Sequence, residues 1–167
     1  MMRRINHVLL CVLSLLLLRP APATPCINEL HYENTGADVS EGVEIVGVAG
    51  ASLAGYTVAL YNGATGLRYG SYVQLNGTIP DEGNGFGTVA FPMSGIQNGA
   101  PDGLALVDAS SVARQFLSYE GTFTANDGPA QGMTSVDMMV SESASTAVGH
   151  SLQLNGTGSR CSDFAWT

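Results

Sequence analysis

Residues 29–44 hold the densest group of side chains that could do chemistry. The carboxylate and imidazole side chains of this segment are Glu29, His31, Glu33, Asp38, Glu41 and Glu44. Calcium takes about six to eight oxygen ligands, and extracellular modules often hold it weakly, but the spacing matches no EF-hand loop. The alternative is an acidic edge exposed to water. Because carboxylates this close repel one another unless a cation or a hydrogen-bond donor separates them, we predict a binding edge for a basic partner or a weakly bound calcium ion. Its candidate residues are Glu29, Asp38, Glu41 and Glu44.

Motifs for enzyme catalysis are absent from the sequence. A serine hydrolase needs a Gly-x-Ser-x-Gly elbow and a zinc enzyme needs His-Glu-x-x-His or paired Cys-x-x-Cys, and none of these patterns occurs. The glycine-rich segment 83–87 has no lysine to cradle a phosphate and follows Asp81 and Glu82. A glycosidase would need a carboxylate pair across a sugar-binding cleft, and the single Trp offers few aromatic platforms. We therefore predict a protein that is not an enzyme and uses no cofactor.

The charge of the chain excludes two classes of partner. Of its 167 residues, 14 are Asp or Glu and 6 are Arg, with no Lys, so that the formal net charge is −8. Nucleic acids are bound through cationic side chains that release counterions from phosphates, and anionic lipid surfaces also attract basic residues. We therefore expect neither nucleic acid nor an anionic membrane surface among the partners.

The first 23 residues have the pattern of a secretory signal peptide. Arg3 and Arg4 form a basic head, residues 8–18 form an apolar run, and residues 21–23 read Ala-Pro-Ala before the predicted cleavage after Ala23. A membrane anchor is the alternative, but a spanning helix needs roughly 20 apolar residues and this run is shorter. We expect a secreted or extracytoplasmic protein without a membrane span after cleavage.

Two cysteines follow the predicted signal peptide. Cys26 and Cys161 form an even pair without Cys-x-x-Cys spacing, which in an oxidising compartment indicates a disulfide, with two free buried thiols as the alternative. Asn76 and Asn155 each begin an Asn-Gly-Thr sequon. They are candidate glycosylation sites if the host glycosylates, and plain turns otherwise.

Glycine and turn signals indicate an all-β fold for residues 24–167. All 21 Gly lie in this part of the chain, which is too many for long helices, and Asn-Gly turn signals separate short runs rich in Val, Tyr, Phe and Thr. Strands at this spacing predict one β-sandwich domain. The predicted strands are 27–32, 43–48, 56–61, 69–75, 87–91, 104–108, 112–119, 150–154 and 163–166.

Several blocks in order resemble the lamin-tail domains found in secreted proteins. The blocks are 27–32 (INELHY), 41–45 (EGVEI), 53–58 (LAGYTV), 60–63 (LYNG), 98–108 (NGAPDGLALVD) and 112–119 (VARQFLSY). The resemblance covers about residues 27–120, and residues 121–167 look like the C-terminal extension of secreted variants. It implies an immunoglobulin-like sandwich that serves binding or assembly, with no catalytic residues to carry over.

The resemblance leaves two functions open. The first is a secreted, disulfide-closed interaction module without activity of its own. The second is an accessory domain of, or split partner to, a secreted hydrolase of the nuclease or phosphatase type, because secreted family members often carry such domains. We expect this chain to carry the module alone. Its acidic composition and lack of a rod or nuclear signal exclude the nuclear role of filament lamin tails.

Overall fold

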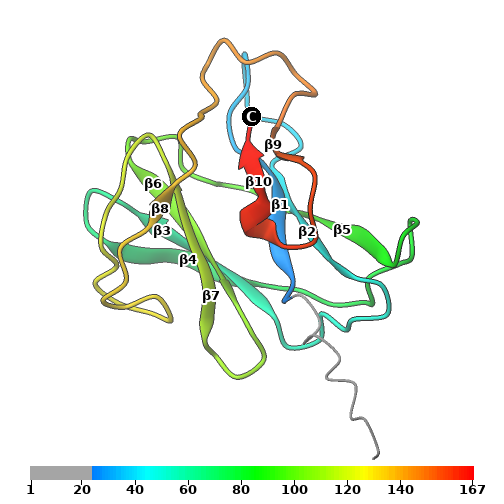
Figure 1. Ribbon diagram of the computed structural model, residues 1–167. Helices are drawn as coiled ribbons and strands as arrows, with labels where there is room; N and C mark the ends of the chain where they lie inside the picture. Colours follow the sequence, from blue (N-terminus) through cyan, green and yellow to red (C-terminus); the bar gives the residue numbers. More distant parts are fainter. Residues whose placement is uncertain (1–23) are drawn as a thin grey trace, which may run out of the picture.

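The computed structural model describes residues 24–167, so the predicted signal peptide lies outside the described residues. The chain forms two five-stranded sheets that face each other in a β-sandwich, as Figure 1 shows. The first sheet has the order β10-β9-β1-β2-β5, with β10 (Phe164–Trp166), β9 (Leu152–Gly156), β1 (Cys26–His31), β2 (Gly42–Val48) and β5 (Phe86–Pro92). The second has the order β4-β3-β6-β7-β8, with β4 (Leu67–Gln74), β3 (Thr57–Asn62), β6 (Asp102–Val107), β7 (Ala113–Tyr119) and β8 (Val136–Asp137). The predicted all-β sandwich is confirmed.

The main core lies between the two sheets. β2 alternates strictly, with Val43 and Ile45 buried and Glu44 on the opposite face, as expected for a strand with one face in the core and one in water. The aromatic rings of Tyr32 and Tyr119 stack in this core with centroids 3.9 Å apart. The alternation of β2 therefore places its even-numbered residues on the outer face of the first sheet.

The second sheet is covered on both faces. All six residues of β6 are buried, because a second apolar cluster forms on the face turned away from the main core. In this cluster Phe116 of β7 packs edge-on against Phe123, which belongs to the segment between β7 and β8. A strand buried on both faces reads as a continuous apolar run, which explains the sequence Leu-Ala-Leu-Val at the end of β6.

The nine predicted strands correspond to nine of the ten observed, with ends that differ by a few residues. β8 was not predicted, because two residues paired in parallel with β7 have no sequence period. The turn predicted at Asn155-Gly156 is wrong: both residues belong to β9 and pair with Ala165 and Phe164 of β10. Only at Asn84-Gly85 do both residues of an Asn-Gly pair take positive φ, 59° and 79°.

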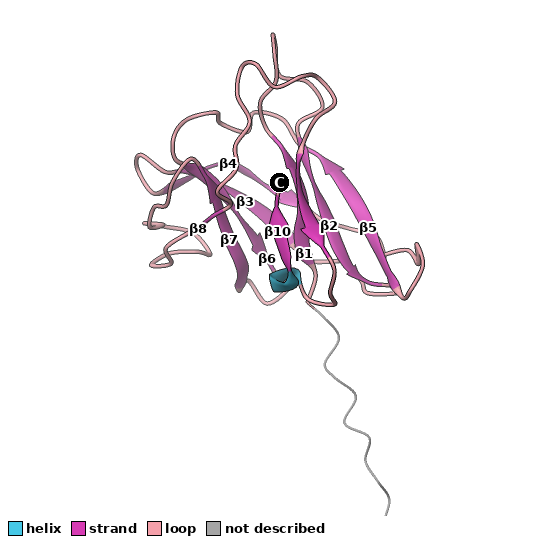
Figure 2. Cartoon of the chain, turned by 45° about the horizontal axis from the view of Figure 1, so that its top comes forward, coloured by secondary structure: helices cyan, strands magenta, loops and turns pink. Residues whose placement is uncertain are grey.

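Residues 152–166 add β9 and β10 to the first sheet, and the short 3₁₀ helix η1 (Cys161–Asp163) lies between these strands, as Figure 2 shows. Within the part of the chain that the structure describes, no helix has the length and hydrophobicity needed to cross a bilayer.

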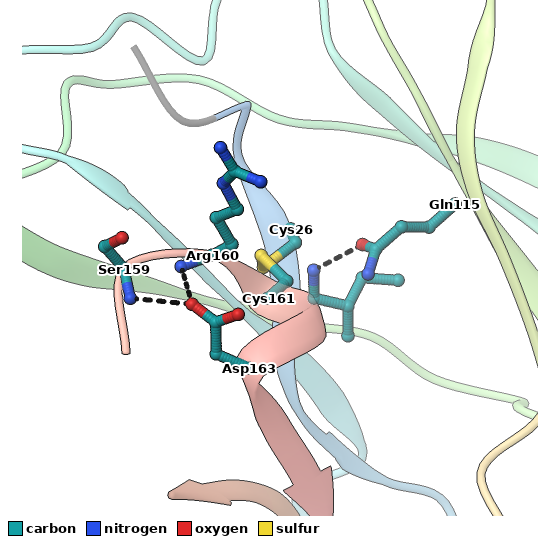
Figure 3. Close-up of a disulfide and its surroundings, with 7 residues drawn as sticks. Cys26, Gln115, Ser159, Arg160, Cys161 and Asp163 are labelled. Carbon is teal, nitrogen blue, oxygen red and sulfur yellow. Dashed lines mark hydrogen bonds between the residues drawn. A yellow bond between two sulfur atoms is a disulfide. The ribbon is translucent and has the colours of Figure 1, made fainter. Parts of the chain in front are cut away.

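The predicted disulfide is confirmed (Figure 3). Cys26 at the start of β1 is bonded to Cys161 at the start of η1, with Cα atoms 6.6 Å apart. The turn that presents Cys161 is held by Asp163, whose Oδ2 accepts hydrogen bonds from the amides of Ser159 (3.0 Å) and Arg160 (2.9 Å). These bonds lower the pKa of Asp163. The disulfide therefore fixes the C-terminal strands to the first strand of the sheet.

Candidate functional site

Two of the four predicted edge residues form a row across the first sheet. Glu29 of β1 lies directly opposite Glu44 of β2, and Glu44 lies opposite Ala90 of β5. The Asn28 side chain donates a hydrogen bond of 2.7 Å to Glu44 Oε1. Among residues 24–167 the ion pairs are His31–Glu142 and Arg114–Asp108, so neither glutamate of the row has a cationic partner there. Like charges directly opposite each other destabilise a sheet unless something separates them.

The row lines a shallow groove of about 330 Å³ on the outer face of β1, β2 and β5. Its floor and walls also include His31, Gly42 and Pro92. Gly42 is required here because a Cβ at this position would lie 2.7 Å from the backbone oxygen of Phe91. The groove therefore combines an uncompensated negative charge with a close approach of β2 and β5.

The other two predicted edge residues hold loops together. Asp38 accepts hydrogen bonds from the side chain of Asn98 and from the amide of Asn34, each 3.0 Å long, and these bonds lower the pKa of Asp38. Glu41 accepts from the amides of Gly95 and Ile96, both at 2.8 Å. The two carboxylates thus tie the 34–41 loop to the segment that follows β5.

The geometry gives no support to the calcium alternative. The described part of the chain contains no group of three or more His, Cys, Asp or Glu side chains placed to hold a metal ion. Glu29 and Glu44 face the groove, whereas Asp38 and Glu41 are satisfied by other partners. Of the four predicted edge residues, the groove therefore contains the Glu29–Glu44 pair.

Sequence reasoning missed Glu142, which with Asp102 is one of the two most buried carboxylates of the described residues. Glu142 is 2% exposed and lies in the segment between β8 and β9. Its Oε1 is 2.7 Å from Nδ1 of His31, and its Oε2 accepts from the amides of Tyr32 (2.6 Å) and Glu33 (2.9 Å). The Tyr32 hydroxyl in turn accepts a hydrogen bond of 2.8 Å from the Glu142 amide. Glu142 therefore fixes the 138–150 segment to the end of β1.

The surroundings of His31 favour a doubly protonated ring. Nδ1 faces the Glu142 carboxylate, and Nε2 faces the carbonyl oxygen of Val39 (3.0 Å) and Oδ1 of Asn34 (3.2 Å). The Asn34 amide group is oriented by its own donors, which bond the carbonyls of Thr35 and Ala37, so Oδ1 is the acceptor. Burial alone would lower the pKa of His31, but the hydrogen bond and charge of Glu142 outweigh it and raise the pKa above the ordinary 6.5.

This pair predicts a pH dependence of stability. Because the folded pKa of His31 lies above its unfolded value, the pair contributes fully below pH 6.5 and its contribution is lost as the pH rises through the folded pKa. We expect the free energy of unfolding, from urea titrations between pH 5.5 and 9, to fall in this range by at most about 1.4 kcal/mol per pH unit, the limit for one proton. The fall should disappear in His31→Gln and persist in the exposed control His150→Gln. A wild-type protein with no fall would contradict the charged pair.

Three further side chains with raised pKa values, those of Asp102, Tyr69 and Tyr119, have structural roles. Asp102 is buried, which raises its pKa, and both of its oxygens accept from backbone amides, of Gly63 (2.9 Å) and Gly99 (3.0 Å). Burial raises the pKa of Tyr69 to about 12 and that of Tyr119 further, so both phenols stay protonated. The Tyr119 hydroxyl donates to the carbonyl of Gln97. None of these groups is placed to act as a base.

Both predicted glycosylation sites are accessible. The side chain of Asn76 is exposed in the turn after β4, and that of Asn155 is exposed on β9. Their modification stays a prediction.

Comparison of the chain with family models, with curated proteins and with solved structures gave no match.

Proposed function

We propose that residues 24–167 act as a secreted, non-catalytic interaction module of the immunoglobulin-like, lamin-tail type, which recruits a basic protein partner. The observation that carries the proposal is the Glu29–Glu44 pair: two opposed carboxylates on a solvent-facing groove, without a cation from the described residues. A cation supplied from outside would relieve this repulsion.

The charge of the described residues supports the same conclusion. These residues include 14 Asp or Glu and three Arg, namely Arg68, Arg114 and Arg160, so their formal charge is −11. Such a charge attracts basic partners over long range and disfavours nucleic acid. The disulfide supports secretion, because such bonds persist mainly in oxidising compartments.

The lack of catalytic function is supported by how the buried polar groups are used. Glu142 and Asp102 accept hydrogen bonds within the fold on both carboxylate oxygens, and His31 has acceptors on both ring nitrogens. A general base needs an accessible lone pair within reach of its substrate, and these buried groups face partners inside the fold. An accessory role beside a secreted hydrolase needs no base on this chain, and it stays the alternative to the proposal.

The experiment that tests the proposal is capture of proteins from the secreted fraction of the source cells on the immobilised protein. We expect a basic protein to be retained and then lost with the double variant Glu29→Gln, Glu44→Gln. The matched control, Glu33→Gln with Glu120→Gln, makes the same charge change elsewhere and should retain the partner. Equal capture of the partner by the two double variants would overturn the proposal. So would turnover of an ester, phosphodiester or glycoside by the purified protein, if one carboxylate substitution abolishes it.

A further inference from the structure

The two sheets end in four edge strands, and β5 is the one whose edge stays long and regular up to Pro92, the proline that ends it. β8 and β10 are two and three residues long, which is too short to template another strand. β4 is long, but its pairing with β3 shifts at Gly70 (φ 63°), and the Arg68 guanidinium lies 4.4 Å from the centroid of the Tyr72 ring and bonds the edge carbonyl of Gly70. Such a bulge and a charged side chain on the edge are the usual protection against strand addition.

β5 instead pairs with β2 in seven consecutive residue pairs without a register shift. The hydrogen bonds that flank this ladder, Met93 N to Glu41 O and Ala49 N to Gly85 O, are both 2.9 Å long. Because bonded and non-bonded pairs alternate in an antiparallel ladder, the odd-numbered residues of β5 bond β2, and Thr88 and Ala90 direct their N–H and C=O groups away from the sheet. The outward carbonyl of Phe86 is already bonded within the turn before β5, since it accepts a hydrogen bond of 2.9 Å from the Glu82 amide.

We propose that the β5 edge binds an extended segment of a partner protein by strand addition, with a Lys or Arg of that segment opposite Ala90. A residue in that position continues the row Glu29–Glu44–Ala90. The methyl group of Ala90 is small and exposed, so a long basic side chain can lie over it and place its cation at the Glu44 carboxylate. The backbone groups of Thr88 and Ala90 would give affinity, and the row would give specificity.

A second copy of this chain is the other possible occupant of the edge. The formal charge of −11 on the described residues opposes it, because pairing two β5 edges would bring two such charges together and add no cation to either row. A basic segment of a different protein is complementary to the same edge. The inference rests on the proposed function for the identity of the partner charge, and adds the site and the binding mode.

The test uses a fluorescent, end-blocked peptide, Lys-Val-Lys-Val-Lys, whose Lys side chains lie on one face when it is extended, and measures its binding to the purified protein by fluorescence polarisation. Ala90→Pro removes only the outward N–H of β5 and leaves the ladder to β2 intact, since Pro is tolerated on an edge whose N–H faces solvent. We expect it to weaken binding about tenfold or more, through one lost hydrogen bond and the obstructing ring. Glu44→Gln should weaken binding about threefold to tenfold and reduce its salt dependence.

A peptide with N-methyl groups on its lysines tests the backbone mode without altering the protein. If the segment adds antiparallel, the amide of the lysine opposite Ala90 faces β5, and this peptide should not bind. A second peptide, N-methylated on its valines, covers parallel addition, in which the valine amides face β5. If Glu44→Gln weakens binding while Ala90→Pro and both N-methylated peptides bind normally, strand addition is wrong and the proposed function stands. No binding of the unmodified peptide overturns the inference, while the capture experiment decides the proposed function separately. A dimer in sedimentation that Ala90→Pro abolishes would identify a second copy as the occupant and also overturn it.

Discussion

Replacing Glu142 by Gln should lower the free energy of unfolding by about 3–5 kcal/mol, the range for breaking a buried ion pair by removing one partner. The substitution leaves the His31 ring facing acceptors without a counter-charge. The NH2 of the new glutamine side chain also points either toward His31 or toward the backbone amides of Tyr32 and Glu33. In the wild-type protein these two amides donate hydrogen bonds to Glu142 Oε2. In the first orientation His31 must give up its Nδ1 proton to accept from the new amide, and in the second orientation donors face donors. Both orientations lose the charged pair, and unpaired buried donors cost more than the lost bond itself.

Urea denaturation at pH 6 measures this effect, because His31 is charged there and the pair contributes fully. Glu33→Gln is the matched control: it removes the same charge from the residue next to Tyr32, and its side chain is only half-buried. We expect the control to change stability by less than about 0.5 kcal/mol, as is usual for surface substitutions. A Glu142→Gln protein as stable as the control would show that the network does not hold the 138–150 segment.

The strands were predictable because each depends on local periodicity. The alternation of β2 and the apolar run of β6 are visible within six or seven residues. Glu29 and Glu44 lie on consecutive predicted strands, and the register places the two residues opposite each other. Their shared position follows because consecutive strands usually lie next to each other in a sheet.

The buried network was not predictable because its partners are far apart in the sequence. His31 and Glu142 are separated by 111 residues, and Glu142 lies in a segment without regular structure, where no period marks a residue as buried. Asp38 and Glu41 look like exposed ligands in the sequence because nothing local identifies the amides and the Asn98 side chain that satisfy them. A carboxylate that binds backbone and a carboxylate that binds a partner have the same sequence signal.

Removing the disulfide should have an effect of similar size. Cys26 and Cys161 are 135 residues apart, so the bond closes almost the whole described chain into one loop. Chain-entropy estimates for loops of this length give about 4–5 kcal/mol, most of it through the restricted unfolded state. We expect the double variant Cys26→Ser, Cys161→Ser to unfold at a correspondingly lower urea concentration, with a larger m-value because its unfolded chain is more expanded.

The same variant separates an effect on the unfolded state from a loss of local structure. If the bond acts mainly on the unfolded chain, β9 and β10 stay paired in the native state, since their ladder and the Gln153–Thr167 backbone bonds do not involve the cysteines. Hydrogen exchange of the Ala165 and Thr167 amides, relative to the global unfolding rate, should then change little. Fast exchange confined to residues 152–167, with the rest of the sandwich as stable as wild type, would instead show that the bond only fastens the C-terminal strands to β1.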